Sequence, residues 1–494
     1  MGYPTAVRRR VAGLVLILLA GCGTTTPIGV QGSGAGSLGD GATPINSAVP
    51  PPVESAANGA SPATGGLPRS AAPMPIPTYR PPGLEVAPGA TVKPGAPVEV
   101  GLLTDNYQSS AALEESANTP FRSGDNGSAM KAVVRYFNAR GGLAGHHIVP
   151  VLFGFNVSGA DSWTQQYQNA CTAFTEDHHV VAVVGTVAVP GWESFASCLS
   201  RHHVPWVSDT PSAVFDNTDF QSYAPYLYAP DGFSGSRWSL TVDQLAAAGY
   251  FNSTAKVGIY YVATATASRT VRNVIKPRLA HYGHSAVAEI GLTPSSNFTD
   301  TGNTYAAPTA SAILQFRRAG VDHILCVATT GACLLILMTA AESQNYRPRY
   351  ALTTSDGLFG SSVAPQAQLV GALASSWTPT VDVGQSQVPP VNRSRKMCEQ
   401  ITRGIPTGSN GPPSLAIDCT GLFFLKFAFD RAGQITPSAL RSAVDALGTA
   451  FDAPTTWTTR FAPGRHDGVS SLGLLVYNTG CSCFVYKGGV TAAP

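Results

Sequence analysis

The sequence predicts an α/β protein made of two doubly wound, Rossmann-like lobes. Short apolar runs rich in β-branched residues alternate with helical segments from residue 98 to residue 354. This alternation is what a parallel sheet needs when helices cover both of its faces. The alternation starts again after the segment Tyr-Leu-Tyr-Ala-Pro at 226–230, so a second lobe of the same architecture follows the first.

The length and composition fit a large globular protein with a weakly charged surface. The chain has 494 residues, of which 44% are hydrophobic and 12% are charged, and its net charge is +2. This length is enough for two or three domains with substantial cores, and the charged share is low for a globular protein. Because no basic cluster follows Arg10, we expect no nucleic-acid partner.

The first 22 residues have the features of a lipoprotein signal peptide. Three arginines at 8–10 precede an apolar run at 11–20, and Leu-Ala-Gly-Cys at 19–22 ends it. The apolar run is too short to cross a bilayer as a helix. The ending looks like a bacterial lipobox, which implies cleavage before Cys22 and a lipid such as palmitate on its thiol; an unprocessed anchor helix is the alternative. We therefore expect the protein at the outer face of a bacterial cell membrane.

Residues 23–97 predict a disordered tether. Gly, Pro, Ala, Ser and Thr dominate this segment, and Tyr79 is its one aromatic residue. Such a composition cannot bury enough apolar surface to offset the entropy of ordering. A flexible chain of this length would hold the folded part roughly 45–50 Å from its anchor.

Eight cysteines remain after Cys22, and an even number in an exported chain favours disulfides. The connectivity does not follow from the sequence. We expect local pairs, of which the one across a single intervening residue is the least secure. A metal site is the alternative, but no ligand spacing typical of metal sites occurs. The expected pairs are Cys171–Cys198, Cys326–Cys333, Cys398–Cys419 and Cys481–Cys483.

The first lobe begins with a strand at 98–103 and a polar loop at 104–127. A helix at 128–140 follows, with Val133, Val134 and Phe137 on one face and Gly141-Gly142 at its end. The other expected elements of this lobe are strands at 147–155, 180–184 and 204–207 and helices at 162–176 and 192–201.

The second lobe continues the alternation, and three helices and two strands follow it. The last of these helices has Thr436 as its N-cap and Pro437 at its first position. The expected helices lie at 236–248, 268–281, 305–319, 332–343, 392–403, 414–432 and 438–447, and the expected strands at 257–262, 286–292, 323–328, 350–354, 369–376, 472–477 and 483–486.

Two strand-to-loop junctions lie close together between residues 180 and 213. The first is the loop at 185–190, and the second is the hydroxyl-rich loop at 208–212. Small ligands bind outside the carboxyl ends of the strands in open α/β sheets. Both loops are therefore the first candidates for a site, and ordinary connections are the alternative.

From residue 98 to residue 488 the chain resembles the type I periplasmic binding proteins, in particular the branched-chain amino-acid-binding branch that serves ABC importers. In that family the first helix ends in Asn-x-x-Gly-Gly-hydrophobic-x-Gly, and Asn138, Gly141, Gly142 and Gly145 match this pattern. The strands at 180–185 and 204–208 and the Gly-Val-Asp at 320–322 match further landmarks. The order and spacing of these segments carry the resemblance.

The resemblance implies two lobes joined by hinge strands, with a small solute bound between them and closure on binding. By analogy the chain crosses between the lobes near residues 229–230, again before residue 392 and again near 458–463. Lobe I would comprise residues 98–229 and about 390–457, and lobe II would comprise residues 230–389 and about 458–488.

The resemblance also implies which loops contact the solute. Hydroxyl and backbone N–H groups of lobe I would suit a carboxylate. Amino-acid binders of the family have an acidic residue at the position of Asp356, where it pairs with the ligand ammonium. The expected ligand-binding residues are Tyr107, Ser109, Thr186, Val189, Thr210, Ser212, Thr264, Thr266, Thr330 and Asp356.

Two departures from the family pattern leave the solute open. The apolar segment at 187–190 replaces small polar residues after the third strand, and no aromatic residue lies near 329–330. A more apolar or differently shaped solute than an amino acid therefore also fits. Each hydroxyl has an alternative role as a helix cap, and Asp356 before Gly357 has one as a turn residue.

The sequence thus predicts a lipid-anchored extracytoplasmic protein that delivers a small solute to an ABC permease and needs neither cofactor nor metal. A ligand-sensing lipoprotein with a signalling or cell-envelope partner is the alternative. A third hypothesis is an enzyme, because Ser128 and Lys131 form an S-x-x-K pair. The other motifs of penicillin-interacting enzymes are missing from the sequence, so we expect no enzymatic activity.

Overall fold

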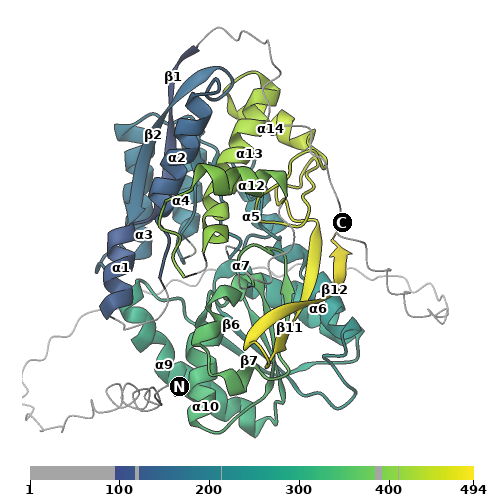
Figure 1. The fold of residues 1–494 in the computed structure, drawn as a ribbon. Helices are drawn as coiled ribbons and strands as arrows, with labels where there is room; N and C mark the ends of the chain where they lie inside the picture. Colours follow the sequence, from purple (N-terminus) through teal and green to yellow (C-terminus); the bar gives the residue numbers. More distant parts are fainter. Residues whose placement is uncertain are drawn as a thin grey trace, which may run out of the picture. The chain divides into compact units, whose positions relative to one another are not determined.

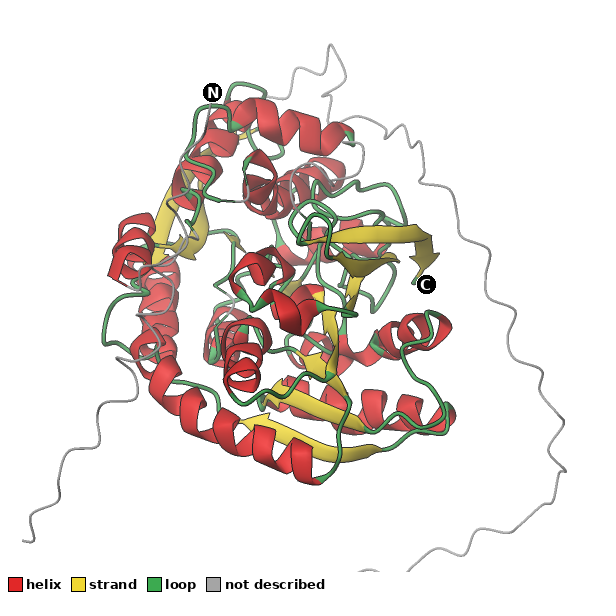
Figure 2. Cartoon of the chain, turned by 60° about the horizontal axis from the view of Figure 1, so that its bottom comes forward, coloured by secondary structure: helices red, strands yellow, loops and turns green. Residues whose placement is uncertain are grey.

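A computed structural model describes residues 95–116, 122–187, 189–212, 214–383, 392–409 and 411–493. The expected signal peptide, Cys22 and nearly all of the expected tether lie outside these residues. The described chain forms one five-stranded and one seven-stranded sheet, each packed against helices (Figures 1 and 2). We call the five-stranded sheet and the helices that pack on it lobe I, and the seven-stranded sheet with its helices lobe II.

The sheet of lobe I is parallel throughout and has the order β2-β1-β3-β4-β5. Side chains of the interior strand β1 enter two different cores: Val100 and Leu102 pack on one face, and Leu103 packs on the other. Both faces of the sheet are therefore buried, as the sequence predicts. Its strands are β1 (Gly95–Asp105), β2 (His146–Phe155), β3 (Val183–Val184), β4 (Trp206–Val207) and β5 (Leu227–Tyr228).

Helices from two distant parts of the chain cover lobe I. Figure 1 shows α2 beside α13, and Phe137 of α2 meets Phe423 of α13 with their ring centroids 5.7 Å apart. The helices are α1 (Tyr107–Ser116), α2 (Asn126–Asn138), α3 (Trp163–Thr172) with a π-helical continuation (Ala173–Asp177), α4 (Trp192–Arg201), α5 (Asn217–Ser222), α12 (Arg393–Ile401), a 3-10 turn (Pro412–Leu415), α13 (Ala416–Ala432) and α14 (Pro437–Asp445).

The loop expected at 104–127 is wrong in part, because it contains helix α1. Asn106 begins this helix: its Oδ1 accepts hydrogen bonds from the backbone N–H groups of Gln108 (3.0 Å) and Ser109 (3.1 Å). An asparagine cap satisfies N–H groups that have no partner within the helix. The segment is polar and lacks the apolar periodicity from which the other helices were predicted. The start of α1 therefore depends on this asparagine cap.

The Asn-x-x-Gly-Gly pattern after α2 has a clear structural role. The side chain of Asn138 pairs with the backbone of β2, donating to the carbonyl of Ile148 and accepting from its N–H, both at 2.8 Å. Gly142 has φ +67°, and a β-carbon there would lie 1.9 Å from the carbonyl oxygen of His146. The pattern therefore fixes the tight return from helix to strand.

The sheet of lobe II has the order β12-β11-β10-β9-β8-β6-β7. The strands from β7 to β10 are parallel, whereas β11 and β12 are antiparallel to their neighbours. Its strands are β6 (Val257–Val262), β7 (Ala286–Leu292), β8 (His323–Val327), β9 (Arg349–Thr353), β10 (Leu373–Ser376), β11 (Ser471–Asn478) and β12 (Cys483–Ala492).

Three helices of lobe II lie close to their predicted ranges, and two of these contain π-helical turns. The helix expected at 305–319 begins seven residues earlier, at Phe298. A short helix at Gln366–Leu369 was not predicted, and the strand expected at 369–376 begins only at Leu373. Figure 2 shows helices beside the strands of this sheet. The elements are a 3-10 turn (Gly235–Arg237), α6 (Ser239–Ala247), α7 (Ala265–Thr270), a π-helix (Val271–Ile275), α8 (Lys276–His281), α9 (Phe298–Arg318), a π-helix (Cys333–Leu337), α10 (Met338–Ser343), 3-10 turns (Thr354–Asp356 and Leu358–Val363) and α11 (Gln366–Leu369).

All four expected disulfides are present. One joins α3 to α4 and another joins α12 to α13, both in lobe I. The third links the end of β8 to the helix that follows it, and the fourth lies in the turn between β11 and β12. Within the described part of the chain, no helix is long and apolar enough to cross a membrane.

The segments that connect the two lobes pair with each other. The backbone N–H of Ala229 donates to the carbonyl of His466, and the N–H of Gly468 donates to the carbonyl of Ala229, both at 2.9 Å. The N–H of Ser234 donates to Asp467 Oδ2 at 3.1 Å. The residues after β5 and those before β11 thus form one joint between the lobes, while the exact lobe boundaries stay a prediction.

Candidate ligand-binding site

The loops after β3 and β4 lie side by side, as the sequence predicts. The Oγ1 of Thr186 lies 2.8 Å from the Oγ of Ser208 and 2.7 Å from the carbonyl oxygen of Gly185. The indole N–H of Trp206 donates to the same carbonyl at 2.8 Å. Thr186 is half-buried and Ser208 is buried, so Thr186 is the hydroxyl of this pair that a solute could reach.

The other predicted residues of lobe I differ in their exposure and in their hydrogen bonds. Tyr107 is exposed at the start of α1. Ser109 is engaged, because its Oγ donates to the carbonyl of Asn106 (2.9 Å) and accepts from the N–H of Val157 (3.2 Å). Three further predicted residues are half-buried in the loops after β3 and β4, and their ligand contacts stay predictions: Val189, which packs against the core of lobe I, Thr210 and Ser212.

Two predicted threonines of lobe II bond within the protein. Thr264 is the N-cap of α7, and its Oγ1 accepts from the N–H of Ala267 at 3.1 Å. Thr266 is buried and donates to Asp219 Oδ2 at 2.7 Å. The structure therefore gives Thr264 the role of a helix cap, which was the alternative to ligand binding. It places Thr266 in a contact between the lobes.

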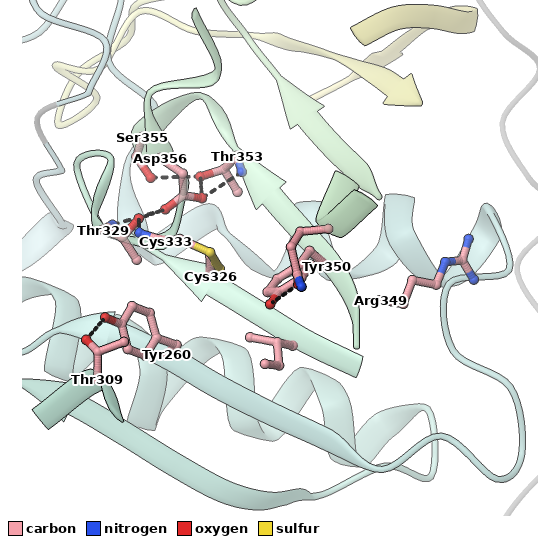
Figure 3. Close-up of a disulfide and its surroundings, with 12 residues drawn as sticks. Tyr260, Thr309, Cys326, Thr329, Cys333, Arg349, Tyr350, Thr353, Ser355 and Asp356 are labelled. Atoms are coloured by element: carbon pink, nitrogen blue, oxygen red, sulfur yellow. Dashed lines mark hydrogen bonds between the residues drawn. A yellow bond between two sulfur atoms is a disulfide. The ribbon is translucent and has the colours of Figure 1, made fainter. Parts of the chain in front are cut away.

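Asp356 is fully buried in the 3-10 turn that follows β9. Figure 3 shows its hydrogen bonds with Thr329 and Thr353. Its Oδ1 accepts from the N–H and hydroxyl of Thr329 (3.0 and 2.8 Å), and its Oδ2 accepts from the N–H and hydroxyl of Thr353 (2.8 and 3.0 Å). Burial raises the pKa of Asp356, and these hydrogen bonds oppose the increase. The carboxylate thus joins the ends of β8 and β9, and its pairing with a ligand ammonium stays a prediction. Thr330 is exposed beside it.

We expect Asp356→Asn to lower the free energy of unfolding by about 1–3 kcal/mol. An amide can accept hydrogen bonds at only one of the two positions, so the donors of Thr329 or Thr353 would lose their acceptor in a buried place. Urea unfolding measures the change, with exposed Asp161→Asn as the control. An Asp356→Asn protein as stable as the control would contradict this structural role.

Three buried aspartates at the carboxyl edge of lobe I were not predicted. Asp209 follows β4, Asp231 follows β5, and Asp418 lies in the first turn of α13. They are 3%, 0% and 5% exposed. One oxygen of each has no hydrogen-bond partner among the described residues: Asp209 Oδ2, Asp231 Oδ1 and Asp418 Oδ2. A buried polar group without a partner is costly, so it needs an explanation.

These three aspartates gather around residues 418–421 of α13. A β-carbon placed on Gly421 would lie 3.1 Å from Asp209 Oδ2, and Asp418 is one helical turn before Gly421. The hydroxyls of Thr420 and Thr455 are 3.0 Å apart, and that of Thr455 donates to Asp231 Oδ2 at 3.3 Å. Gly421 therefore leaves the space that the Asp209 side chain occupies.

The same edge carries two further carboxylates. Asp105 ends β1 and accepts from Ser110 (2.5 Å) and Asn126 (3.1 Å), and Asp125 caps α2. Their charges act on Asp418. No Lys or Arg of the described chain forms an ion pair with any of the five: Asp105, Asp125, Asp209, Asp231 and Asp418.

The pKa values of the three buried groups are raised, and burial is the largest cause for each. Burial, followed by the charge of Asp231, raises the pKa of Asp209 well above its usual range. Burial, followed by the charge of Asp209, does the same for Asp418, and burial raises the pKa of Asp231. No residue spacing indicates this cluster, because its members come from three separate parts of the chain.

An arginine joins the facing edges of the two lobes. Arg269 of α7 donates from Nε to Asp216 Oδ2 (2.7 Å) and from Nη2 to Asp219 Oδ1 (2.6 Å), both at the start of α5. Burial favours a higher pKa for Asp216, but the hydrogen bonds of Arg269 and backbone N–H groups lower it overall. These contacts form a charged bridge between lobe I and lobe II.

A second contact between the lobes lies at the start of α3 and α9. The N–H of Trp163 donates to the carbonyl of Ser296 at 2.7 Å, and the side-chain amide of Asn297 donates to the carbonyl of Ala160 at 3.3 Å. Both bridging contacts join loops or helix starts at the carboxyl edges of the sheets. The two edges therefore face each other.

The described residues contain no group of three or more His, Cys, Asp or Glu that could hold a metal ion. A pocket of about 360 Å³ lies at the opposite, amino edge of the lobe II sheet, away from the predicted residues. Its lining is Ala248, Arg349, Gly371, Ala372, Leu373, Leu474, Val476, Tyr477 and Lys487.

Comparisons with known proteins identify the fold. No protein-family model matches the chain, and no curated protein matches it. Among solved structures, it is similar to a solute-binding protein of an ABC transporter from Rhodopseudomonas palustris BisB5 in complex with 3,4-dihydroxybenzoic acid. The TM-score is 0.56 at 12% identity, over 80% of this chain and 97% of that one.

Two further solved structures are similar to this chain. The first is an ABC transporter substrate-binding protein from Desulfitobacterium hafniense in complex with Leu, with a TM-score of 0.53 at 14% identity over 80% of this chain and 100% of that one. The second is a type 1 periplasmic binding protein from Bordetella pertussis Tohama I, with a TM-score of 0.56 at 13% identity over 79% of this chain and 100% of that one. The fold implied by the sequence resemblance is thus confirmed.

Proposed function

We propose that this chain, which has the type I periplasmic binding protein fold, is a non-enzymatic solute-binding protein that holds a small molecule between its two lobes. The observation that carries the proposal is the arrangement of the facing carboxyl edges, which the Arg269 bridge and the Trp163–Ser296 contact hold together. In doubly wound folds this edge is where ligands bind.

The rest of the proposal comes from the sequence and from the similar structures. Those structures include solute-binding proteins of ABC transporters in complex with 3,4-dihydroxybenzoic acid or with Leu. The lipobox-like ending at Cys22 supports a lipid anchor at the outer face of a cell membrane, and the likeness to ABC components supports delivery of the solute to a permease. Both stay proposals about this chain.

A thermal-shift screen of the purified protein tests the proposed function. The screen would include amino acids, hydroxybenzoates, amines, guanidines and sugars. We expect at least one class to raise the unfolding temperature with a saturable dose response, because a ligand that binds only the native state stabilises it. A complete lack of stabilisation across the classes would contradict the proposal.

The Arg269 bridge yields a prediction for any solute that the screen finds. Arg269→Gln removes the two-pronged contact with Asp216 and Asp219 and therefore weakens the closed arrangement. We expect the dissociation constant to rise about tenfold, mainly through faster release. Isothermal titration calorimetry measures the affinity, and stopped-flow kinetics measures the release rate.

Arg278→Gln is the matched control for this variant. Arg278 pairs with Asp243 wholly inside lobe II, so its loss should leave solute affinity unchanged. Equal affinities for the Arg269→Gln, Arg278→Gln and parent proteins would show that the bridge does not contribute to closure.

A further inference from the structure

The strongest unexplained feature of the molecule is the set of three carboxylates at Asp209, Asp231 and Asp418, which we call the aspartate cluster. Each is at least nine-tenths buried, and each has an oxygen without a partner among the described residues. The favourable position of Asp418 in the first turn of a helix explains one carboxylate. It does not explain why three of them converge on residues 418–421.

We infer that the aspartate cluster binds the cationic nitrogen group of the solute, a guanidinium or the ammonium groups of a diamine. This inference rests on the proposed function and names the chemical class of the solute. Carboxylates accept strong, charge-assisted hydrogen bonds from such groups. The unpartnered oxygens of Asp209, Asp231 and Asp418 would then have donors when the solute is bound.

The geometry favours an organic cation over a metal ion. A metal needs its oxygen ligands within one coordination shell, and no group of three acidic side chains in the described chain has that arrangement. Asp231 is linked to α13, which carries Asp418, through Thr455 and Thr420, so the carboxylates are spread along the edge. A guanidinium has five N–H donors in a plane, and a diamine has two separate charges, so either can contact acceptors at several positions.

The acidic groups of the edge also disfavour a carboxylate at this position. Asp105 and Asp125 add two acidic groups to the three of the cluster, and no ion pair with a Lys or Arg of the described residues neutralises any of them. A bound benzoate or an amino-acid carboxylate would meet acidic groups with no neutralising cation, and each of them that is ionised would repel it. This differs from the expectation that hydroxyls of lobe I hold the carboxylate of an amino acid.

The raised pKa values of the three groups are consistent with binding of a cation. In the empty protein, burial favours the neutral, protonated form of Asp209, Asp231 and Asp418. A cation favours the ionised form, so its binding releases protons. Affinity should therefore rise as the pH rises, with Asp105 and Asp125 as the other titratable groups that face the cluster.

The test is calorimetric titration of the purified full chain with agmatine, putrescine, leucine and 4-hydroxybenzoate. We expect agmatine or putrescine to bind at one site with an affinity that rises between pH 5 and pH 8. Asp209→Asn and Asp418→Asn should each weaken this binding at least tenfold. Both variants should also unfold at the same temperature as the unliganded parent or at a higher one, because an amide needs no ionisation.

Glu176→Gln is the control, since Glu176 is an exposed acid of lobe I and its loss should not change affinity. The inference is overturned if neither cation binds, or if the two aspartate variants bind agmatine and putrescine as tightly as the control does. If leucine or 4-hydroxybenzoate binds in place of the cations, the proposed function stands and this inference fails. If no compound binds here or in the thermal-shift screen, both fail.

Discussion

The Gly185→Ala protein will be less stable than the parent by at least about 4 kcal/mol. Gly185 follows β3 with φ +112°, and a β-carbon there would lie 1.9 Å from the carbonyl oxygen of Leu103. That oxygen belongs to the backbone of β1, which is paired on both sides with β2 and β3, so it cannot move aside. Gly185 also donates to the carbonyl of Val207 at 3.0 Å, and the clash would therefore break the pairing of three strands.

Gly283→Ala separates the clash from the effect of the backbone angle. Gly283 also has positive φ, at +76°, but a β-carbon there would meet nothing within 4 Å. Its replacement should cost only about 1–2 kcal/mol. Urea unfolding followed by circular dichroism measures both variants. If the two lose the same stability, the close contact between β3 and β1 is not what requires the glycine.

The second large effect is expected at Arg237, whose guanidinium holds the joint between the lobes. It pairs with buried Asp467 and donates to the carbonyls of Val469 (2.7 Å) and Ala493 (2.9 Å). Arg237→Met would leave Asp467 charged and buried without its cation. Breaking a buried pair in this way costs about 3–5 kcal/mol, and we expect a loss of this size in urea unfolding at pH 7.

A double variant tests the cause of that loss. Adding Asp467→Asn to Arg237→Met removes the unpaired charge, so the double variant should recover part of the stability. Arg347→Met, which breaks an exposed pair with Glu342, should change stability little. A double variant no more stable than Arg237→Met alone would show that the charge of Asp467 is not the source of the loss.

Most of the fold could be predicted because it depends on local patterns. The strands at 257–262 and 286–292 and the helix at 192–201 have the expected bounds, since apolar runs and periodic faces fix them. The strands expected at 180–184 and 204–207 shorten to two residues each. Interior strands of a parallel sheet need few paired residues when both faces are buried. The apolar runs in the sequence therefore do not show where these two strands end.

The candidate site was harder to predict than the fold. Thr186 and Ser208 lie together as expected, because β3 and β4 are neighbours in both chain order and sheet order. Asp418 lies at the carboxyl edge only because the chain returns from lobe II to lobe I and there forms α13. A sequence pattern shows which residues share a face, but it does not show which distant segments meet. The aspartate cluster depends on such a meeting.

The central claim is that a small solute binds between the two lobes and contacts both. Hydrogen exchange measured peptide by peptide, with and without a solute found in the screen, tests this claim most directly. We predict that the solute slows exchange both in the loops of lobe I at residues 185–187 and 208–212 and in lobe II at α7, whose Thr266 donates to Asp219 of lobe I. Slowed exchange in one lobe alone, or at the 360 Å³ pocket on the far edge of lobe II, would contradict it.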